Sequence, residues 1–171
     1  EIDTFYGGKR LRSSGHGFAG MSRMKLLLLL QERCRELGVT LDFEREVADP
    51  STLECDLLVG ADGIASTVRE RWPAAFEPDI DLRPNRFVWL GTTVPYEAFT
   101  FYFKENAHGM FRVHAYRYEP GASTFIVECT EATLRNTGLD PQDEDGTAAY
   151  IAELFADELQ GHPLLKNRSI W

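Results

Sequence analysis

Residues 55–69 read CDLLVGADGIASTVR, which is a short apolar run, a glycine turn and a helix start in succession. The run from Leu57 to Val59 predicts a strand covered on both faces, because such strands lack the alternation of half-buried ones. The turn leads into a predicted helix from about Ile64 to Arg71, which Pro73 ends. The free N–H groups and partial positive charge of a helix start attract phosphate, and Gly63 lets the backbone come close. The segment therefore predicts a nucleotide site.

The same residues also have a purely structural interpretation, in which Asp62 caps the helix and Gly63 turns the chain without a ligand. The whole segment, however, resembles the DG motif of the FAD-dependent aromatic hydroxylases, flavoprotein monooxygenases similar to p-hydroxybenzoate hydroxylase. In that family the motif is associated with binding of both FAD and NAD(P)H. Ser66 and Arg69, at helical spacing, complete the pattern. The resemblance therefore implies that Asp62, Gly63, Ser66 and Arg69 bind the cofactor.

A second part of the family's pattern begins at Ser22, which can cap a helix that runs to about Leu37 and ends at Gly38. The sequence SRMKLLLLL at residues 22–30 resembles the family's Arg-x-x-Leu-x-x-x-Leu helix start, in which the arginine faces the flavin nucleotide. An arginine is unfavourable beside the positive end of a helix dipole unless an anion lies there too. The resemblance implies that Arg23 binds FAD, and a solvated arginine is the alternative.

The N-terminal part of the chain predicts a β-hairpin, because a Gly-Gly pair that tolerates positive φ separates Thr4–Tyr6 from Lys9–Arg12. The glycine-rich loop that follows contains His16. In the resembling enzymes this loop precedes the flavin-contacting helix, which implies that His16 approaches the flavin or the substrate. A solvated loop histidine is the alternative. Beyond that helix, apolar residues alternate from Val39 to Phe43 and predict a half-buried strand.

The composition changes after Pro73, where prolines and charges suggest an extended linker into a second unit. In that unit apolar and polar residues alternate with a period of two, which is typical of strands. We therefore expect a partial FAD-binding domain at residues 1–72 and a substrate domain at residues 73–171. The expected fold class is α+β or α/β, with a fragment of a Rossmann-like domain and an antiparallel sheet, for which a meander is the simplest topology. The predicted strands are 86–94, 99–104, 110–118 and 124–129. An amphipathic helix is predicted after them, at residues 143–160.

The predicted strand 110–118 has an unusually polar and aromatic face for a structural sheet, because Arg112, His114 and Tyr116 alternate along it. On the preceding strand, Phe101 lies on one side with two further phenylalanines. We expect one face of the sheet to be core and the other to be partly polar, and parity leaves open which face lines a pocket. Phe101, His114 and Tyr116 are the candidate substrate residues.

The chain also resembles one branch of the family, the hydroxylases that act on salicyloyl-CoA or anthraniloyl-CoA. The stretches that carry this resemblance include SGHGF at 14–18, RPNRFVWLGT at 83–92 and STFIVEC at 123–129. An anionic coenzyme A thioester needs local positive charge, and the candidates to supply it are Arg83, Arg86, Arg112 and Arg117, of which Arg83 and Arg86 are the ones to test by charge reversal. Ordinary surface arginines are the alternative.

The composition excludes several classes of function. The 18 basic and 27 acidic residues give a net charge of −9, which opposes binding to nucleic acid. The cysteines lie far apart with no CxxC pair, so we expect neither a metal site nor a disulfide framework, and a reducing, cytoplasmic location. The longest apolar run, Leu26 to Leu30, is far shorter than the ~20 residues that cross a bilayer.

Both ends of the chain look cut, and the family's GxGxxG and Gly-Asp segments are absent, so we expect an interior piece that is inactive alone. By resemblance, its parent would use FAD, NAD(P)H and O2 to hydroxylate an activated aromatic ring. One rival is a non-catalytic module that binds a ligand or a partner. Another is a flavin oxidoreductase that inserts no oxygen, and O2 uptake with a hydroxylated product would separate it from a hydroxylase.

Overall fold

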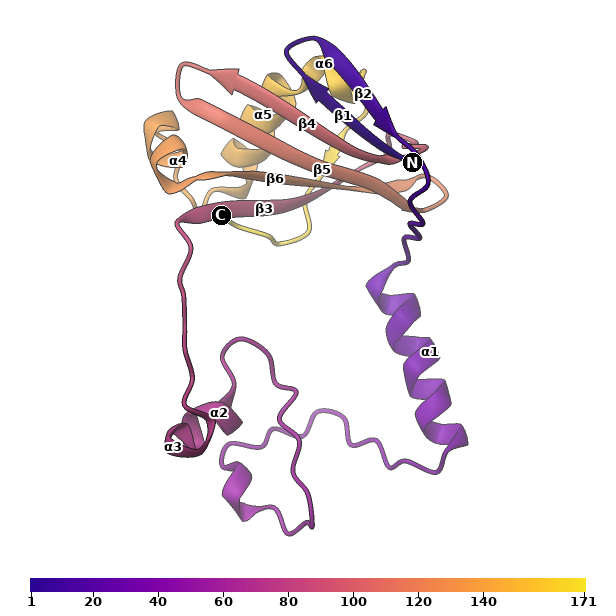
Figure 1. Cartoon of the computed structure of the whole chain (residues 1–171), viewed down its shortest axis with the longest axis vertical. Coiled ribbons are helices and arrows are strands. Elements are labelled where there is room, and N and C mark those ends of the chain that lie inside the picture. Colours follow the sequence, from indigo (N-terminus) through magenta and orange to yellow (C-terminus); the bar gives the residue numbers. More distant parts are fainter. The chain divides into compact units, whose positions relative to one another are not determined.

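The computed structural model describes residues 1–171 and contains one seven-stranded mixed sheet with helices, an α+β fold (Figure 1). The chain divides into two compact units, residues 1–29 with 84–171, called here the sheet unit, and residues 30–83, called here the DG unit. The strands are β1 (Ile2–Tyr6), β2 (Lys9–Ser13), β3 (Asn85–Thr92), β4 (Phe99–Asn106), β5 (Gly109–Glu119), β6 (Ala122–Thr130) and β7 (Leu164–Leu165). The helices are α1 (Arg23–Glu36), η1 (Pro50–Thr52, a 3₁₀ turn), α2 (Thr67–Arg71), α3 (Pro73–Phe76), α4 (Glu131–Thr137), α5 (Glu144–Leu154) and α6 (Ala156–Leu159).

The sheet corrects the expected antiparallel meander. Its strand order is β2-β1-β4-β5-β6-β3-β7, so β3 neighbours β6 instead of β4, and β1 runs parallel to β4. The pairing of β3 with β6 places Val88 opposite Val127 and Leu90 opposite Phe125, and all four side chains are buried. Strand parity is a local property, whereas the choice of neighbour depends on such buried pairs across the sheet. The predicted hairpin β1–β2 is confirmed.

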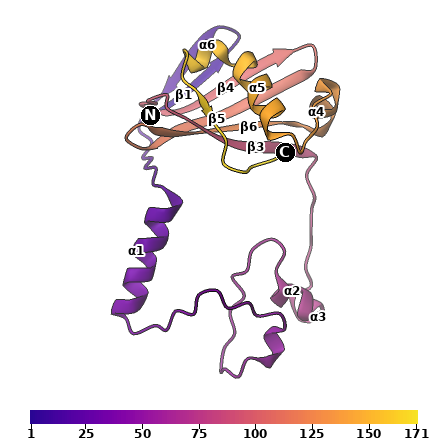
Figure 2. The ribbon, with the colours of Figure 1, turned by 180° about the vertical axis from the view of Figure 1, so that it is seen from behind.

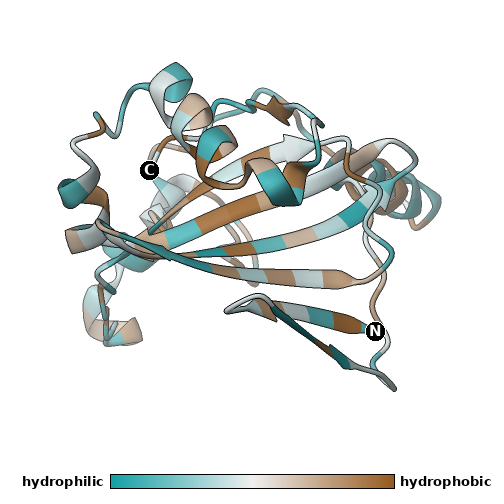
Figure 3. Cartoon of the chain, turned by 90° about the horizontal axis from the view of Figure 1, so that it is seen from above, coloured by the Kyte–Doolittle hydropathy of each residue, from teal (hydrophilic) through white to brown (hydrophobic).

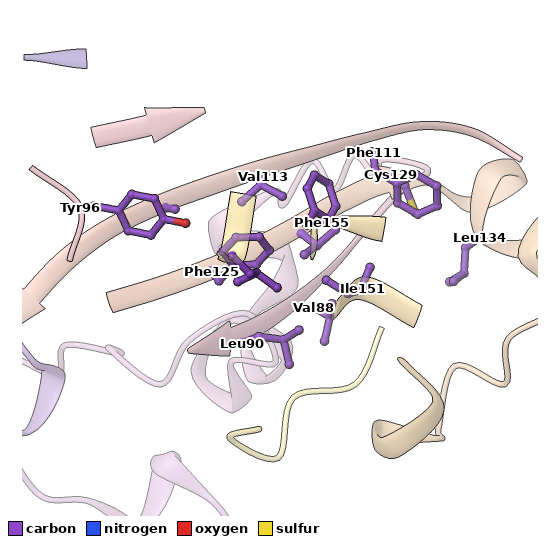
Figure 4. Close-up of a cluster of buried hydrophobic side chains, with 13 residues drawn as sticks. Val88, Leu90, Tyr96, Phe111, Val113, Phe125, Cys129, Leu134, Ile151 and Phe155 are labelled. Carbon is purple, nitrogen blue, oxygen red and sulfur yellow. The ribbon is translucent and has the colours of Figure 1, made fainter. Parts of the chain in front are cut away.

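The core lies on one face of the sheet, beneath α5 and α6, which are behind the sheet in Figure 1 and in front of it in Figure 2. Apolar stretches run along the central strands (Figure 3). Phe111, Val113 and Ala115 of β5 are fully buried there, and the β3 and β6 side chains beside them complete the layer (Figure 4). The opposite face of the central strands, called here the open face, is therefore the one that carries His114 and Tyr116.

The helix expected over residues 143–160 is two helices that meet at Phe155. Asp143 caps α5 by accepting hydrogen bonds from the N–H groups of Asp145 and Gly146 at 3.0 and 2.9 Å. The chain turns at Phe155, whose ring is wholly buried and packs edge-on against Phe125 at 5.7 Å. The change of direction lets both Phe155 and Leu159 reach the core.

Helix α1 is confirmed with its predicted ends, because Ser22 Oγ accepts from Lys25 N at 3.3 Å and Gly38 has a φ of 74°. No helix of the chain is long and apolar enough to cross a membrane.

In the DG unit, the two predicted strands, Val39–Phe43 and Leu57–Val59, are wrong, since neither is a strand. A strand needs a neighbouring strand for its hydrogen bonds, and the DG unit contains none. Leu57 and Val59 are accordingly 80% and 74% exposed.

Candidate functional site

The DG segment is held by its own aspartate. Asp62 Oδ1 accepts from the Ser66 hydroxyl at 2.6 Å, and Oδ2 accepts from the backbone N–H groups of Thr67 and Val68 at 2.7 and 3.3 Å. Ser66 Oγ in turn accepts from Arg69 N at 3.1 Å. The hydrogen bond from Ser66, with those from Thr67 and Val68, holds the pKa of Asp62 well below its usual range. Asp62 and Ser66 thus cap α2, which begins three residues later than predicted.

The loop between Asp62 and α2 has backbone N–H donors that are available to a ligand. The backbone N–H groups of residues 63–66 make no hydrogen bond within the chain. Gly63 has a φ of +84° and open space where a side chain would be, so its backbone is accessible. An open groove of about 490 Å³ runs along this loop and is lined by Gly63, Ser66, Arg69 and Phe76 among others. Accessible N–H donors beside an arginine fit a polyanionic cofactor such as FAD.

Gly60 fixes the position of α2 against the turn. A Cβ at Gly60 would lie 2.7 Å from Val68 Cβ, so the close contact requires glycine. Arg69 bends back over the loop, and its guanidinium donates to the carbonyl oxygen of Ile64. The Asp62, Gly63, Ser66 and Arg69 predicted as cofactor ligands therefore form one compact turn.

The open face of the sheet carries a ladder of aromatic rings. Phe99 stacks on Tyr116 at a centroid distance of 5.2 Å, and Phe101 meets the His114 ring edge-on at 5.0 Å. Phe18, from the loop before α1, packs on both Phe99 and Tyr116 at 4.8 and 5.1 Å. The structure thus brings the predicted residues Phe101, His114 and Tyr116 onto one surface, and it resolves the question of parity by placing them opposite the core.

A carboxylate lies beside His114, one ring of this ladder. Glu128 of β6 accepts from Arg112 Nη2 at 2.5 Å and from Asn85 Nδ2 at 2.7 Å, and its Oε2 lies 3.8 Å from His114 Nε2. Burial lowers the pKa of His114, and the negative charge of Glu128 opposes that shift. The sequence interpretation did not select Glu128, although the period of two along residues 124–129 places it on the same face as Thr124.

Arg23 stands at the first residue of α1 and lines a groove of about 680 Å³ on the sheet unit. Trp89, Tyr116, Tyr118 and Arg168 line the same groove, so Arg23 shares a cavity with one predicted substrate residue. This groove combines cationic and aromatic side chains, which suits a planar anionic ligand.

The remaining candidates are more solvent-exposed. His16 is exposed and shares a hydrogen bond of 2.7 Å with Ser13 Oγ, outside the aromatic ladder. Arg83, in the DG unit, forms an ion pair with Asp81 at 2.8 Å, and its side chain is 80% exposed. Arg86, at the start of β3, lies 3.5 Å from Glu131. The two arginines therefore each have a neighbouring carboxylate.

Both the DG turn and the aromatic sheet face lie within a segment that matches a known protein family. Residues 20–170 match the FAD binding domain family, and the chain is a member of it. Among similar proteins, the chain is 37% identical over its whole length to salicyloyl-CoA 5-hydroxylase of Streptomyces sp, of which it covers 35%. It is 32% identical over 91% of its length to protodeoxyviolaceinate monooxygenase of Chromobacterium violaceum, of which it covers 42%.

A third relative is 3-hydroxy-4-methyl-anthranilyl-[aryl-carrier protein] 5-monooxygenase of Streptosporangium sibiricum, which is 38% identical over 88% of the chain. The chain covers 39% of that protein, so it spans between a third and about two fifths of each of these relatives. All three relatives are named as hydroxylases or monooxygenases, which agrees with the expectation of a flavin-dependent aromatic monooxygenase.

Proposed function

We propose that the protein to which this chain belongs is an FAD- and NAD(P)H-dependent monooxygenase that hydroxylates an aromatic acyl thioester. The observation that carries the proposal is the open face of the sheet, where a ladder of aromatic rings includes one imidazole, in a chain of the FAD binding domain family. The DG turn belongs in this proposal to a Rossmann-like FAD-binding domain, and the sheet belongs to the substrate domain.

Several residues of this chain would hold FAD. The accessible N–H groups at Gly63 suit a phosphate or another acceptor-rich group, and Arg69 adds positive charge beside them. The resemblance to the family adds Arg23 as a further proposed ligand of FAD. Asp62 contributes indirectly, because its hydrogen bonds shape the loop that exposes those N–H groups. When bound, FAD supplies the transfer of electrons from NAD(P)H to O2 and of one oxygen atom to the ring.

The aromatic ladder would bind and orient the ring to be hydroxylated. Phe99, Phe101 and Tyr116 offer flat apolar surfaces at stacking distances from one another. Such surfaces also exclude water, which protects a reactive oxygen donor from unproductive decay. His114 is the one imidazole among these rings.

The thioester part of the proposal is supported by two relatives, which are named for aromatic acyl groups on coenzyme A and on an aryl-carrier protein. We propose coenzyme A as the carrier here, with Arg83 and Arg86 binding its phosphates. Charge reversal to Glu at either position should weaken use of the thioester more than use of the free acid. Equal losses on both substrates would contradict the role of these arginines in binding coenzyme A. If the enzyme prefers a carrier-protein thioester, a carrier protein replaces coenzyme A in the proposal.

The first test is an FAD titration, followed by flavin fluorescence, of the chain with its natural flanking sequences. Gly63→Ala should weaken FAD binding about tenfold or more, an energy of about 1.4 kcal/mol, because a side chain there strains the positive φ and covers the N–H groups. Gly121→Ala is the matched control, since it has a φ of +76° and equally open surroundings in the β5–β6 turn. Equal FAD affinity of the two variants would contradict the role of the DG turn.

A second candidate function is a non-catalytic binding module. One observation favours it, namely that Asp62 and Ser66 use their acceptor atoms to cap α2. If the chain with its natural flanking sequences binds no FAD, the DG turn is structural and this alternative is the better one. A flavin oxidoreductase without oxygen insertion would instead bind FAD and yield no hydroxylated product.

A further inference from the structure

We propose that Glu128 is a positioning residue that orients His114 so that its free ring nitrogen accepts a proton from the substrate's ring substituent. This inference rests on the proposed hydroxylase function. It concerns an acidic residue of the open face that lies beside His114, the imidazole of the aromatic ladder.

The geometry assigns each oxygen of Glu128 a separate partner. Oε1 is held by Arg112 Nη2 and Asn85 Nδ2, at 2.5 and 2.7 Å, which fixes the plane of the carboxylate. Oε2 faces His114 Nε2 at 3.8 Å. The side chain of Glu128 is only 20% exposed, so this arrangement lies largely beneath the neighbouring side chains. An anionic oxygen facing Nε2 favours the tautomer that carries its proton there.

The other nitrogen of the ring is left free. His114 Nδ1 has no hydrogen-bond partner in the chain, and the side chain is 35% exposed on the open face. Phe101 holds the imidazole edge-on at 5.0 Å, which limits its rotation. With the proton on Nε2, the lone pair of Nδ1 is available as an acceptor.

The step is a simple proton transfer. A hydroxyl substituent of the bound ring loses its proton, so its O–H bond breaks while a new N–H bond forms at His114 Nδ1. The electron pair left on the substituent makes the ring more electron-rich and hence more reactive towards an oxygen donor. The imidazolium that forms is stabilised by Glu128, as a carboxylate stabilises a histidine base in hydrolases.

The charges that face His114 set the direction of its pH response. Glu128 on β6 favours the imidazolium, Arg112 on β5 opposes it, and the adjacent positions of β4 contribute the uncharged rings of Phe99 and Phe101. Removing the charge of Glu128 therefore lowers the pH at which His114 titrates. Because a base must be neutral in the free enzyme, kcat/KM rises with pH as His114 loses its proton, and this rise should move to lower pH with Glu128 neutralised.

The test uses Glu128→Gln, which keeps the shape and an acceptor for Arg112, in the protein with its natural flanking sequences. Histidine-selective ¹³C labelling follows the titration of His114 without substrate, and His114→Asn assigns its signal. Glu105→Gln is the matched control, because Glu105 is an exposed acid of the adjacent strand β4 with no contact to His114. We expect His114 to titrate at lower pH in Glu128→Gln only, with a loss of about 10- to 100-fold in the kcat/KM plateau.

An unchanged His114 titration and an unchanged pH profile in Glu128→Gln would overturn the inference. If Glu128→Gln does not fold, Glu128→Asp is the second variant, since withdrawing the carboxylate by one methylene should also lower the His114 titration and reduce the plateau. The proposed function fails separately. If the unaltered protein hydroxylates no aromatic thioester while His114 still responds to Glu128, the pairing stands and the hydroxylase proposal does not.

Discussion

Replacing Phe155 tests whether the turn between α5 and α6 anchors the sheet unit. The ring is wholly buried, lies edge-on to Phe125 at 5.7 Å, and has Lys104 Nζ 5.4 Å from its centroid. Phe155→Ala removes a fully buried aromatic side chain and leaves a cavity, which typically lowers the free energy of unfolding by about 3–5 kcal/mol. That loss is a large fraction of the stability of an ordinary domain, which is about 5–15 kcal/mol.

Phe155→Leu separates the loss of volume from the loss of the aromatic contacts. A swap of similar volume in a core costs less than about 1.5 kcal/mol, and loss of the ring pair adds about 0.5–1.5 kcal/mol. We therefore expect Phe155→Leu to lower the free energy of unfolding by about 2 kcal/mol, roughly half the effect of Phe155→Ala.

The assay is guanidinium unfolding of the chain followed by tryptophan fluorescence, since Trp89 and Trp171 both report on the sheet unit. Phe87→Ala is the control, because Phe87 is 56% exposed on β3 and its truncation should change stability by no more than about 0.5 kcal/mol. The reasoning is refuted if Phe155→Ala is no less stable than this control.

Three further predictions concern charge, reactivity and backbone strain. Hydrogen bonds from Arg12 hold the pKa of Asp3 well below its usual range, so its stabilisation is complete above about pH 4 and is lost as the pH falls further. Asp3→Asn should therefore lower the protection of the β1 amides from hydrogen exchange at neutral pH, and it should reduce the loss of that protection in acid. Burial raises the pKa of the Cys129 thiol to about 11, so a thiol reagent should label exposed Cys55 first and Cys129 only on unfolding. Gly109→Ala should lower the melting temperature and cost about 1–3 kcal/mol, because φ is +134° and the new Cβ would overlap the Thr133 hydroxyl.

Local signals were sufficient for much of the fold. The Gly-Gly turn between β1 and β2, the capped helix α1 and four of the strands follow from residues close together in the sequence. The break at Phe155 was not predicted, since helical spacing continues through it, and only the pocket formed with Phe125 explains the turn. The strand order likewise depends on partners that parity does not identify.

The candidate site shows the same division. The DG motif predicted a turn that the structure contains. In it Ser66 bonds to Asp62, the residue before Gly63, and Arg69 bonds to Ser66 and to the carbonyl oxygen of Ile64. The sequence also placed Phe101, His114 and Tyr116 in alternation, but it gave no means of choosing their face. Glu128 was not predicted, because a single acid in a strand has no sequence signature and its partners lie on β5 and β3.

The pairing of Ile2 with Phe99 joins the first strand to one that the ribosome delivers only after all of residues 30–83. Until then β2 is the only strand of residues 1–98 that pairs with β1, and an isolated two-stranded hairpin is marginally stable in water. The DG unit therefore leaves the ribosome while the sheet unit is still incomplete. A nascent chain halted before residue 99 would carry an unfinished sheet edge, which is a surface that chaperones and proteases recognise.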